Sequence, residues 1–274
     1  MSLVKDLYHS RSMIFSLAKN DFKNRFAGSY LGVVWAFVQP LVTIAIYWIV
    51  FGSGLKDNPA GDLSEPYLLW LVAGICPWIF FNEALNSSSN SLIEYSYIVK
   101  KVVFKISIIP MVKIISSFFV HIFFIGLVIV IGCIYGYWPT FYVLQALYYT
   151  FCVFAFALAL SYFISSITVF FKDLAQIVNI VLQFAMWFTP IMYPIDGTAC
   201  GTVGKFVDYP GVVTVLRFNP MYYIVQGYRD CFIYKVPFWL HYKMTIYFWL
   251  VVLVCFMISM SVYKNLKPHF ADVL

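Results

Sequence analysis

Three amide side chains recur at helical spacing in one apolar stretch of the sequence. Gln176, Asn179 and Gln183 fall on one face of the helix expected over residues 175–193, and Trp187 shares that face. A side-chain amide in apolar surroundings needs a hydrogen-bond partner. The stripe therefore indicates either packing contacts with other helices or a conduit whose amides bind hydroxyl groups.

A second stripe of the same kind lies in the apolar stretch 31–53, where Trp35, Gln39 and Thr43 share a helical face. Aromatic rings offer apolar faces to the C–H surfaces of sugars while amides bond their hydroxyls. The conduit interpretation predicts a glycan path lined by Trp35, Gln39, Gln176, Asn179, Gln183 and Trp187.

Enzyme chemistry has little support, because the ionisable residues that we place inside apolar stretches reduce to Glu83 and His121. Glu83 is expected near an interface, protonated or paired, and His121, among phenylalanines, is expected to be a satisfied buried histidine rather than a proton relay. The six cysteines form no CxxC or Cys/His spacing, so no metal site and no disulfide scaffold is predicted. The sequence has no GxxxxGK[ST] loop. We predict no catalytic residue, and any ATPase must be another chain.

The composition indicates that these residues lie in a membrane protein. Of the 274 residues, 62% are hydrophobic, 21% are aromatic and 11% are charged, whereas soluble domains carry about 25% charged residues. A span of about 20 residues crosses the hydrocarbon core of a membrane. The predicted fold is therefore an all-α integral membrane domain, 1–274, with six transmembrane helices near 31–53, 67–85, 112–135, 142–170, 175–193 and 241–263. Pro77 and the polar residues that follow it predict a bent or early-ending second helix.

Lysine and arginine are concentrated in alternate connections between the spans. The N-terminal segment, the links near residues 100–113 and 172, and the C-terminal tail carry most of them. By the positive-inside rule, both termini are predicted to be cytoplasmic. The net charge of +6 is spread over loops, so no nucleic-acid-binding face is predicted.

Two segments outside the spans have distinct patterns. Residues 12–26, within a cytoplasmic segment 1–30, are predicted to form an amphipathic helix in the membrane interface. The long outer loop 194–240 is rich in aromatic and apolar residues, and Asn219-Pro220 fits the start of a short helix that dips back into the membrane. Cys200 and Cys231 lie in this loop, and we expect free thiols there.

Stretches along nearly the whole chain carry a resemblance to one protein family. Residues 20–32, NDFKNRFAGSYLG, followed by Trp35 and Pro40, resemble the opening of the permease subunits of ATP-binding-cassette exporters for lipid-linked polysaccharides, the O-antigen and teichoic acid exporters. Similar stretches continue through nearly the whole chain, and YWIVFG at 47–52 looks closest to the teichoic acid branch. The further matching stretches are 99–104 with Pro110, 171–174, 189–193, Asn219-Pro220 with Tyr228-Arg229, and 270–274.

The resemblance implies a homodimer in the bacterial cytoplasmic membrane, bound to two nucleotide-binding subunits that hold ATP and Mg. It also implies a substrate, an undecaprenyl-diphosphate-linked glycan that moves from the inner to the outer leaflet. The loop 86–110 would then contact the ATPase through Glu94, Tyr95 and Tyr97. Lys19, Lys23 and Arg25 would contact the lipid diphosphate, because cationic side chains bind phosphate oxygens by charge-assisted hydrogen bonds.

Two alternatives remain at this stage. One is a membrane-embedded transferase acting on lipid-linked sugars, with Glu83 or Asp230 as base. The other is a passive channel. Activity without an ATPase partner would favour the transferase, and conductance independent of nucleotide would favour the channel.

Overall fold

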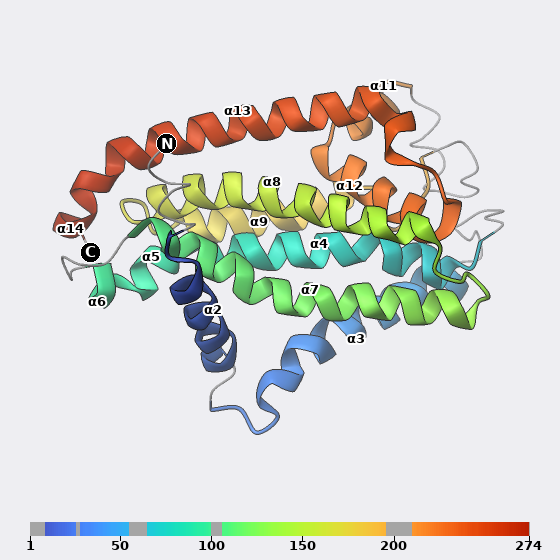
Figure 1. Ribbon diagram of the computed structural model, residues 1–274, viewed down its shortest axis with the longest axis horizontal. Helices are drawn as coiled ribbons and strands as arrows, with labels where there is room; N and C mark the ends of the chain where they lie inside the picture. The colour runs from blue at the N-terminus through green and yellow to red at the C-terminus, as the bar shows by residue number, and fades with distance from the viewer. Residues whose placement is uncertain (1–8, 26–27, 55–64, 100–105, 196–209, 274) are drawn as a thin grey trace.

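The structure, a computed structural model, describes residues 9–25, 28–54, 65–99, 106–195 and 210–273. In this part of the chain the fold is helical, and long helices run side by side as a bundle (Figure 1). The long helices are α3 (Trp35–Ile49), α4 (Tyr67–Ser89), α7 (Ile109–Ile134), α8 (Gln145–Thr168), α9 (Leu174–Phe188) and α13 (Tyr242–Leu266). Short helical turns extend or join them: η1 (Gly32–Val34), η2 (Val50–Gly54), η3 (Ile106–Ile108), η4 (Phe141–Leu144), η6 (Phe238–His241) and η7 (Lys267–His269).

The prediction of an all-α membrane protein is confirmed, and the six predicted spans resolve into two kinds. Within the described residues, five helical segments are long and apolar enough to cross a membrane. The fifth predicted span is the shorter helix α9, 15 residues long, which reaches only about 22 Å at 1.5 Å per residue. It ends at Phe188 because Thr189 is extended before Pro190. The five long segments are Gly32–Gly52, Tyr67–Ser89, Ile106–Ile134, Phe141–Thr168 and Phe238–His269.

Helix α4 forms the centre of the bundle, in contact with α7, α8, α9 and α12. Of the two alternatives predicted after Pro77, a bent or an early-ending helix, the early ending is wrong, because α4 continues to Ser89. In its polar second half, two hydrogen bonds form within the helix itself: Asn86 Nδ2 donates to Asn82 Oδ1 at 3.2 Å, and Ser89 Oγ donates to the Leu85 carbonyl at 2.8 Å. Because α4 is largely buried among other helices, its polar residues and internal proline face protein rather than lipid.

The predicted amphipathic helix is present as α2 (Arg11–Arg25). It runs across the bundle, transverse to α7, at the end where α5 (Ser91–Glu94), α6 (Ser96–Val99) and α14 (Phe270–Val273) also lie (Figure 1). We call this the α5 end. Ile14 and Ala18 are buried against Val112 of α7, whereas Phe15 is exposed, so α2 packs part of its apolar face on protein, and its place in the membrane interface stays a prediction.

The long loop forms α11 (Pro210–Arg217), α12 (Pro220–Arg229) and the turn η5 (Asp230–Tyr234) at the opposite end, the α11 end. The predicted helix start is confirmed, because the Asn219 side chain accepts a hydrogen bond from the Met221 amide at 2.9 Å. Most of α12 is buried against α4 and α8, so the segment is packed within the protein, and its return into the membrane stays a prediction. Cys231 is a buried free thiol. Cys200 lies outside the described residues.

Candidate functional site

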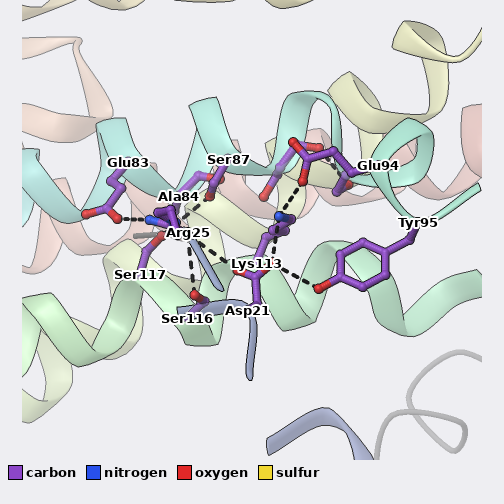
Figure 2. Close-up of polar contacts among 12 residues, drawn as sticks. Asp21, Arg25, Glu83, Ala84, Ser87, Glu94, Tyr95, Lys113, Ser116 and Ser117 are labelled. Atoms are coloured by element: carbon purple, nitrogen blue, oxygen red, sulfur yellow. Dashed lines mark hydrogen bonds and ion pairs between the residues drawn. The ribbon is translucent and has the colours of Figure 1, made fainter. Parts of the chain in front are cut away.

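A network of ion pairs joins α2 to α7 and to the loop after α4 (Figure 2). Lys113 of α7 lies at its centre and is buried. Its Nζ is 2.7 Å from Asp21 Oδ1 and 2.5 Å from Glu94 Oε2. Tyr95 Oη donates to the same Asp21 oxygen at 2.9 Å. One lysine thus holds a carboxylate of α2 and a carboxylate of α5 together.

The surroundings of Asp21 keep its carboxyl group charged. Burial by itself raises the pKa of Asp21, but the hydrogen bond and charge of Lys113, with smaller contributions from Ser116 and Tyr95, bring it below the usual value. Burial and the neighbouring Asp21 carboxylate raise the pKa of Tyr95, so Tyr95 remains a hydrogen-bond donor. Asp21 therefore pairs with Lys113 as a carboxylate at neutral pH.

Arg25, at the end of α2, extends the network into the middle of the bundle (Figure 2). Its Nη1 forms an ion pair with Glu83 Oε1 of α4. Its Nη2 lies 3.3 Å from Ser116 Oγ and 3.6 Å from Asp21 Oδ2. Of the three states predicted for Glu83, near an interface, protonated or paired, the structure shows it paired.

Two cavities open beside this network. The first has a volume of about 540 Å³ and the second about 400 Å³, and both are lined by Arg25, Glu83 and Asn86. Asp21, Glu94 and Lys113 complete the charged wall of the first, which therefore has three carboxylates and two cations. The second is lined by indole, amide and apolar groups, so the Arg25–Glu83 pair separates a charged compartment from an amphipathic one.

The predicted glycan-path residues are divided between the second cavity and an exposed face. Trp35 and Gln39 of α3 line the cavity. Helix α9 contributes Met186 to the same cavity, and Tyr47 Oη donates to Met186 Sδ at 3.7 Å. The other predicted residues of α9 lie on its exposed surface and make no side-chain hydrogen bond to the described residues: Gln176, Asn179, Gln183 and Trp187.

The predicted phosphate contacts lie on two sides of α2. Lys19 and Lys23 are exposed, whereas Arg25 is partly buried in its ion pair with Glu83. The structure thus leaves two cations on the surface of α2 and turns the third into the bundle.

The predicted ATPase contacts also differ from one another. Tyr95 points inward to Asp21, and the half-exposed Glu94 holds Lys113, while Tyr97 is 63% exposed. The matching stretch 99–104 lies largely outside the described residues.

Lys113 is the residue that sequence reasoning missed. We counted only Glu83 and His121 inside the predicted spans, although Lys113 falls within the span predicted over 112–135 and lies in α7. The position of Lys113 at the start of an apolar run is a topology signal, and we used it only as that. A lysine inside a span also needs a carboxylate partner, and this requirement is the signal that could have identified it.

His121 is buried and hydrogen-bonded, as predicted. Its Nε2 is 2.8 Å from Tyr228 Oη, and Thr150 Oγ1 is 2.6 Å from the same hydroxyl. These contacts fix α12 to α7 and α8. Among the described residues, no group of three or more His, Cys, Asp or Glu side chains could hold a metal ion.

The fold and the cavities define a multi-pass membrane protein with polar compartments within a helical bundle and a transverse helix docked by ion pairs. Residues 13–233 match the ABC-2 type transporter family, and the chain belongs to that family.

Similar curated proteins extend over almost the same length. The chain is 26% identical over 230 residues to the "O-antigen export system permease protein RfbA" of Myxococcus xanthus, covering 84% of each chain. It is 24% identical over 265 residues to a protein of the same description from Klebsiella pneumoniae, covering 96% of this chain and 95% of that one. The family resemblance noted in the sequence is thereby confirmed, and membership implies an ATP-binding partner subunit.

Proposed function

We propose that this chain is the membrane-spanning subunit of an ATP-driven exporter of O-antigen-type polysaccharide, carried on undecaprenyl diphosphate across the bacterial cytoplasmic membrane. The observation that carries the proposal is the similarity to O-antigen export permeases over at least 84% of each chain. A separate nucleotide-binding subunit supplies ATP hydrolysis with its Mg. The teichoic acid branch, suggested by residues 47–52, has no support from these relatives.

The exposed amides of α9 support assembly as a homodimer with two nucleotide-binding subunits. Gln176, Asn179 and Gln183 would face lipid in an isolated chain, where an amide finds no partner. A second copy beside α9 would place both stripes around one path for hydroxylated sugar rings.

The ion-pair network supports a route between the ATPase and the substrate. In the proposed orientation, with both termini cytoplasmic, Glu94 and Lys113 connect the ATPase-facing loop to α2. Arg25 then connects α2 to Glu83 in the cavity wall. A lipid diphosphate attracted by Lys19 and Lys23 would reach Arg25 by competing with the Glu83 carboxylate for the guanidinium group.

Glu83 and Asp230, the two residues considered as the base of a transferase, are each engaged by a basic side chain. Glu83 holds Arg25, and Asp230 Oδ2 is 3.2 Å from His241 Nε2. These pairings favour the transport function.

The proposed function can be tested by reconstituting the chain with its ATPase in vesicles that contain lipid-linked O-antigen. We expect ATP-dependent accumulation of glycan on the opposite leaflet, detected by a glycan-specific lectin. An ATPase variant that binds but cannot hydrolyse ATP is the control. Equal accumulation with that variant would contradict an ATP-driven exporter.

The isolated chain is expected neither to bind nor to hydrolyse ATP, because the sequence contains no phosphate-binding GxxxxGK[ST] loop. Purified chain should give no nucleotide-dependent thermal shift and no phosphate release. Hydrolysis that persists after contaminating ATPases are removed would contradict the assignment as a permease subunit.

Tyr97→Ala is expected to weaken ATPase binding by about tenfold, since buried interface tyrosines commonly contribute 1–2 kcal/mol or more. Tyr97 is the exposed member of the predicted contact set, and Tyr95 is engaged with Asp21. Affinity can be measured by titrating ATPase onto immobilised permease. Tyr242→Ala, at the α11 end and also exposed, is the matched control. Unchanged affinity in Tyr97→Ala would place the ATPase contact elsewhere.

A further inference from the structure

A third cavity lies at the α11 end, remote from the network in Figure 2. Its volume is about 250 Å³. It is bounded by the start of α4, the segment after α9, α12 and η5. The lining residues that matter for its chemistry are Trp70, Gln226, Arg229 and Tyr234.

Arg229 is the charged group of this cavity and is only 2% exposed. Its Nη1 donates to the Pro190 carbonyl at 3.0 Å and its Nη2 to the Ile191 carbonyl at 2.9 Å. Its Cζ lies 3.3 Å from the centre of the Trp70 ring. Its Nε is buried without a hydrogen-bond partner.

Within the described residues, no carboxylate forms an ion pair with Arg229. The adjacent Asp230 is directed elsewhere, with Oδ1 accepting from Gln226 Nε2 at 3.2 Å and Oδ2 near His241. Two carbonyls and a ring are neutral partners, and a buried ion without a counter-charge is strongly unfavourable. Among the described residues that line the cavity, none is a carboxylate, so the wall itself holds no anion paired with the guanidinium group.

The other polar groups also favour an acceptor. Tyr234 Oη accepts a hydrogen bond from Trp70 Nε1 at 3.2 Å, which leaves the hydroxyl proton of Tyr234 free to be donated. Tyr234 Oη and the Nε–H of Arg229 are thus available donors, and Arg229 is the charged group among the described lining residues. A guanidinium group matches the oxygen spacing of phosphate.

We propose that this cavity is a phosphate-binding site, in which Arg229 supplies the counter-charge and Tyr234 donates a hydrogen bond. The phosphate could come from the headgroup of a membrane lipid or from a soluble or glycan-linked phosphate. The proposal goes beyond the exporter function and does not depend on it, since binding needs neither ATP nor transport.

The test uses the full-length chain in phosphatidylcholine nanodiscs doped with either phosphatidic acid or diacylglycerol of the same acyl chains. Native mass spectrometry would count the retained lipid. We expect phosphatidic acid to be retained in preference to diacylglycerol, and inorganic phosphate to displace it and to raise the melting temperature.

Variants identify the site. Tyr234→Phe should weaken retention by about tenfold, as expected for a lost hydrogen bond to a charged group. Gly74→Ala should do the same without removing any charge, because the added Cβ would lie 2.7 Å from Arg229 Nη2. Arg229→Gln should abolish retention. If it fails to fold without its two carbonyl contacts, the other two variants still decide the question. Lys243→Gln, an exposed cation at the same end, controls for general surface charge.

Each outcome bears on the proposal. Preferential retention without competition by inorganic phosphate would assign the site to a lipid headgroup. A phosphate-dependent melting shift without lipid preference would assign it to a soluble or glycan-linked phosphate. The proposal is overturned if neither probe binds, or if Lys243→Gln loses as much binding as Tyr234→Phe and Gly74→Ala.

Discussion

Lys113→Met should detach the transverse helix from the bundle and abolish coupling between ATP hydrolysis and export. The lysine is buried and contacts carboxylates of α2 and α5. Removing it leaves Asp21 as a buried carboxylate whose remaining cation, Arg25, is 3.6 Å away; breaking a buried ion pair costs about 3–5 kcal/mol in measured cases. We expect a large drop in melting temperature, and hydrolysis that no longer depends on substrate.

A second substitution distinguishes the effect of the unpaired charge from the effect of the lost packing. Asp21→Asn removes the stranded carboxylate, so the double variant Lys113→Met with Asp21→Asn should recover much of the lost stability. It should not recover coupling, because the link to Glu94 is still missing. Lys264→Met makes the same chemical change at an exposed position of α13 and should alter neither property. A stable, fully coupled Lys113→Met variant would show that the network is incidental to the mechanism.

This network shows what sequence reasoning can and cannot supply. The cost of a charge in a membrane predicted that Glu83 could be paired, and the structure confirms the pairing. The sequence could not identify Arg25 as the partner of Glu83, because Arg25 lies 58 positions away and helical spacing relates only residues on the same helix. The charge of its own segment predicts a lipid-diphosphate contact for Arg25, and that contact stays a prediction.

The boundaries of two helices show a similar limit. Apolar windows overestimated the fifth span because they continued through Pro190, although the residue before a proline is driven from helical geometry. They underestimated α4 because Pro77 and polar residues such as Asn82 and Asn86 predict a bent or early-ending helix. Asn86 bonds Asn82 one turn earlier in the same helix, and α4 is surrounded by other helices of the bundle, which a hydropathy window cannot see. Local signals were more dependable, as the Asn219 cap shows, because they need only adjacent residues.

The amide stripe of α9 is the prediction on which the proposed glycan path depends. The structure leaves Gln183 exposed and without a side-chain hydrogen bond to the described residues. Within one chain, the stripe therefore does not serve as packing contacts. Two roles remain: hydrogen bonding to a second copy of the chain, or hydrogen bonding to the hydroxyl groups of a passing glycan.

Gln183→Leu should distinguish these roles. Interhelical hydrogen bonds in membranes average about 0.6 kcal/mol, so assembly with the ATPase should be nearly normal. Export should fall by up to about tenfold, because a hydrogen bond of 0.5–1.5 kcal/mol to the glycan is lost and a bulky apolar group faces the path. Gln183→Asn retains the amide and should retain most of the export.

The matched control is Ile180→Leu, an apolar change at an exposed position of the same helix, which should leave assembly and export unchanged. Expression, ATPase binding and export are measured on the same vesicle preparations, so that loss of export can be normalised to assembled complex. If Gln183→Leu loses assembly in proportion to export, the stripe is a contact between helices, and the glycan path must be sought in the cavity lined by Trp35 and Gln39. If export falls while assembly holds, the α9 amides contact the substrate.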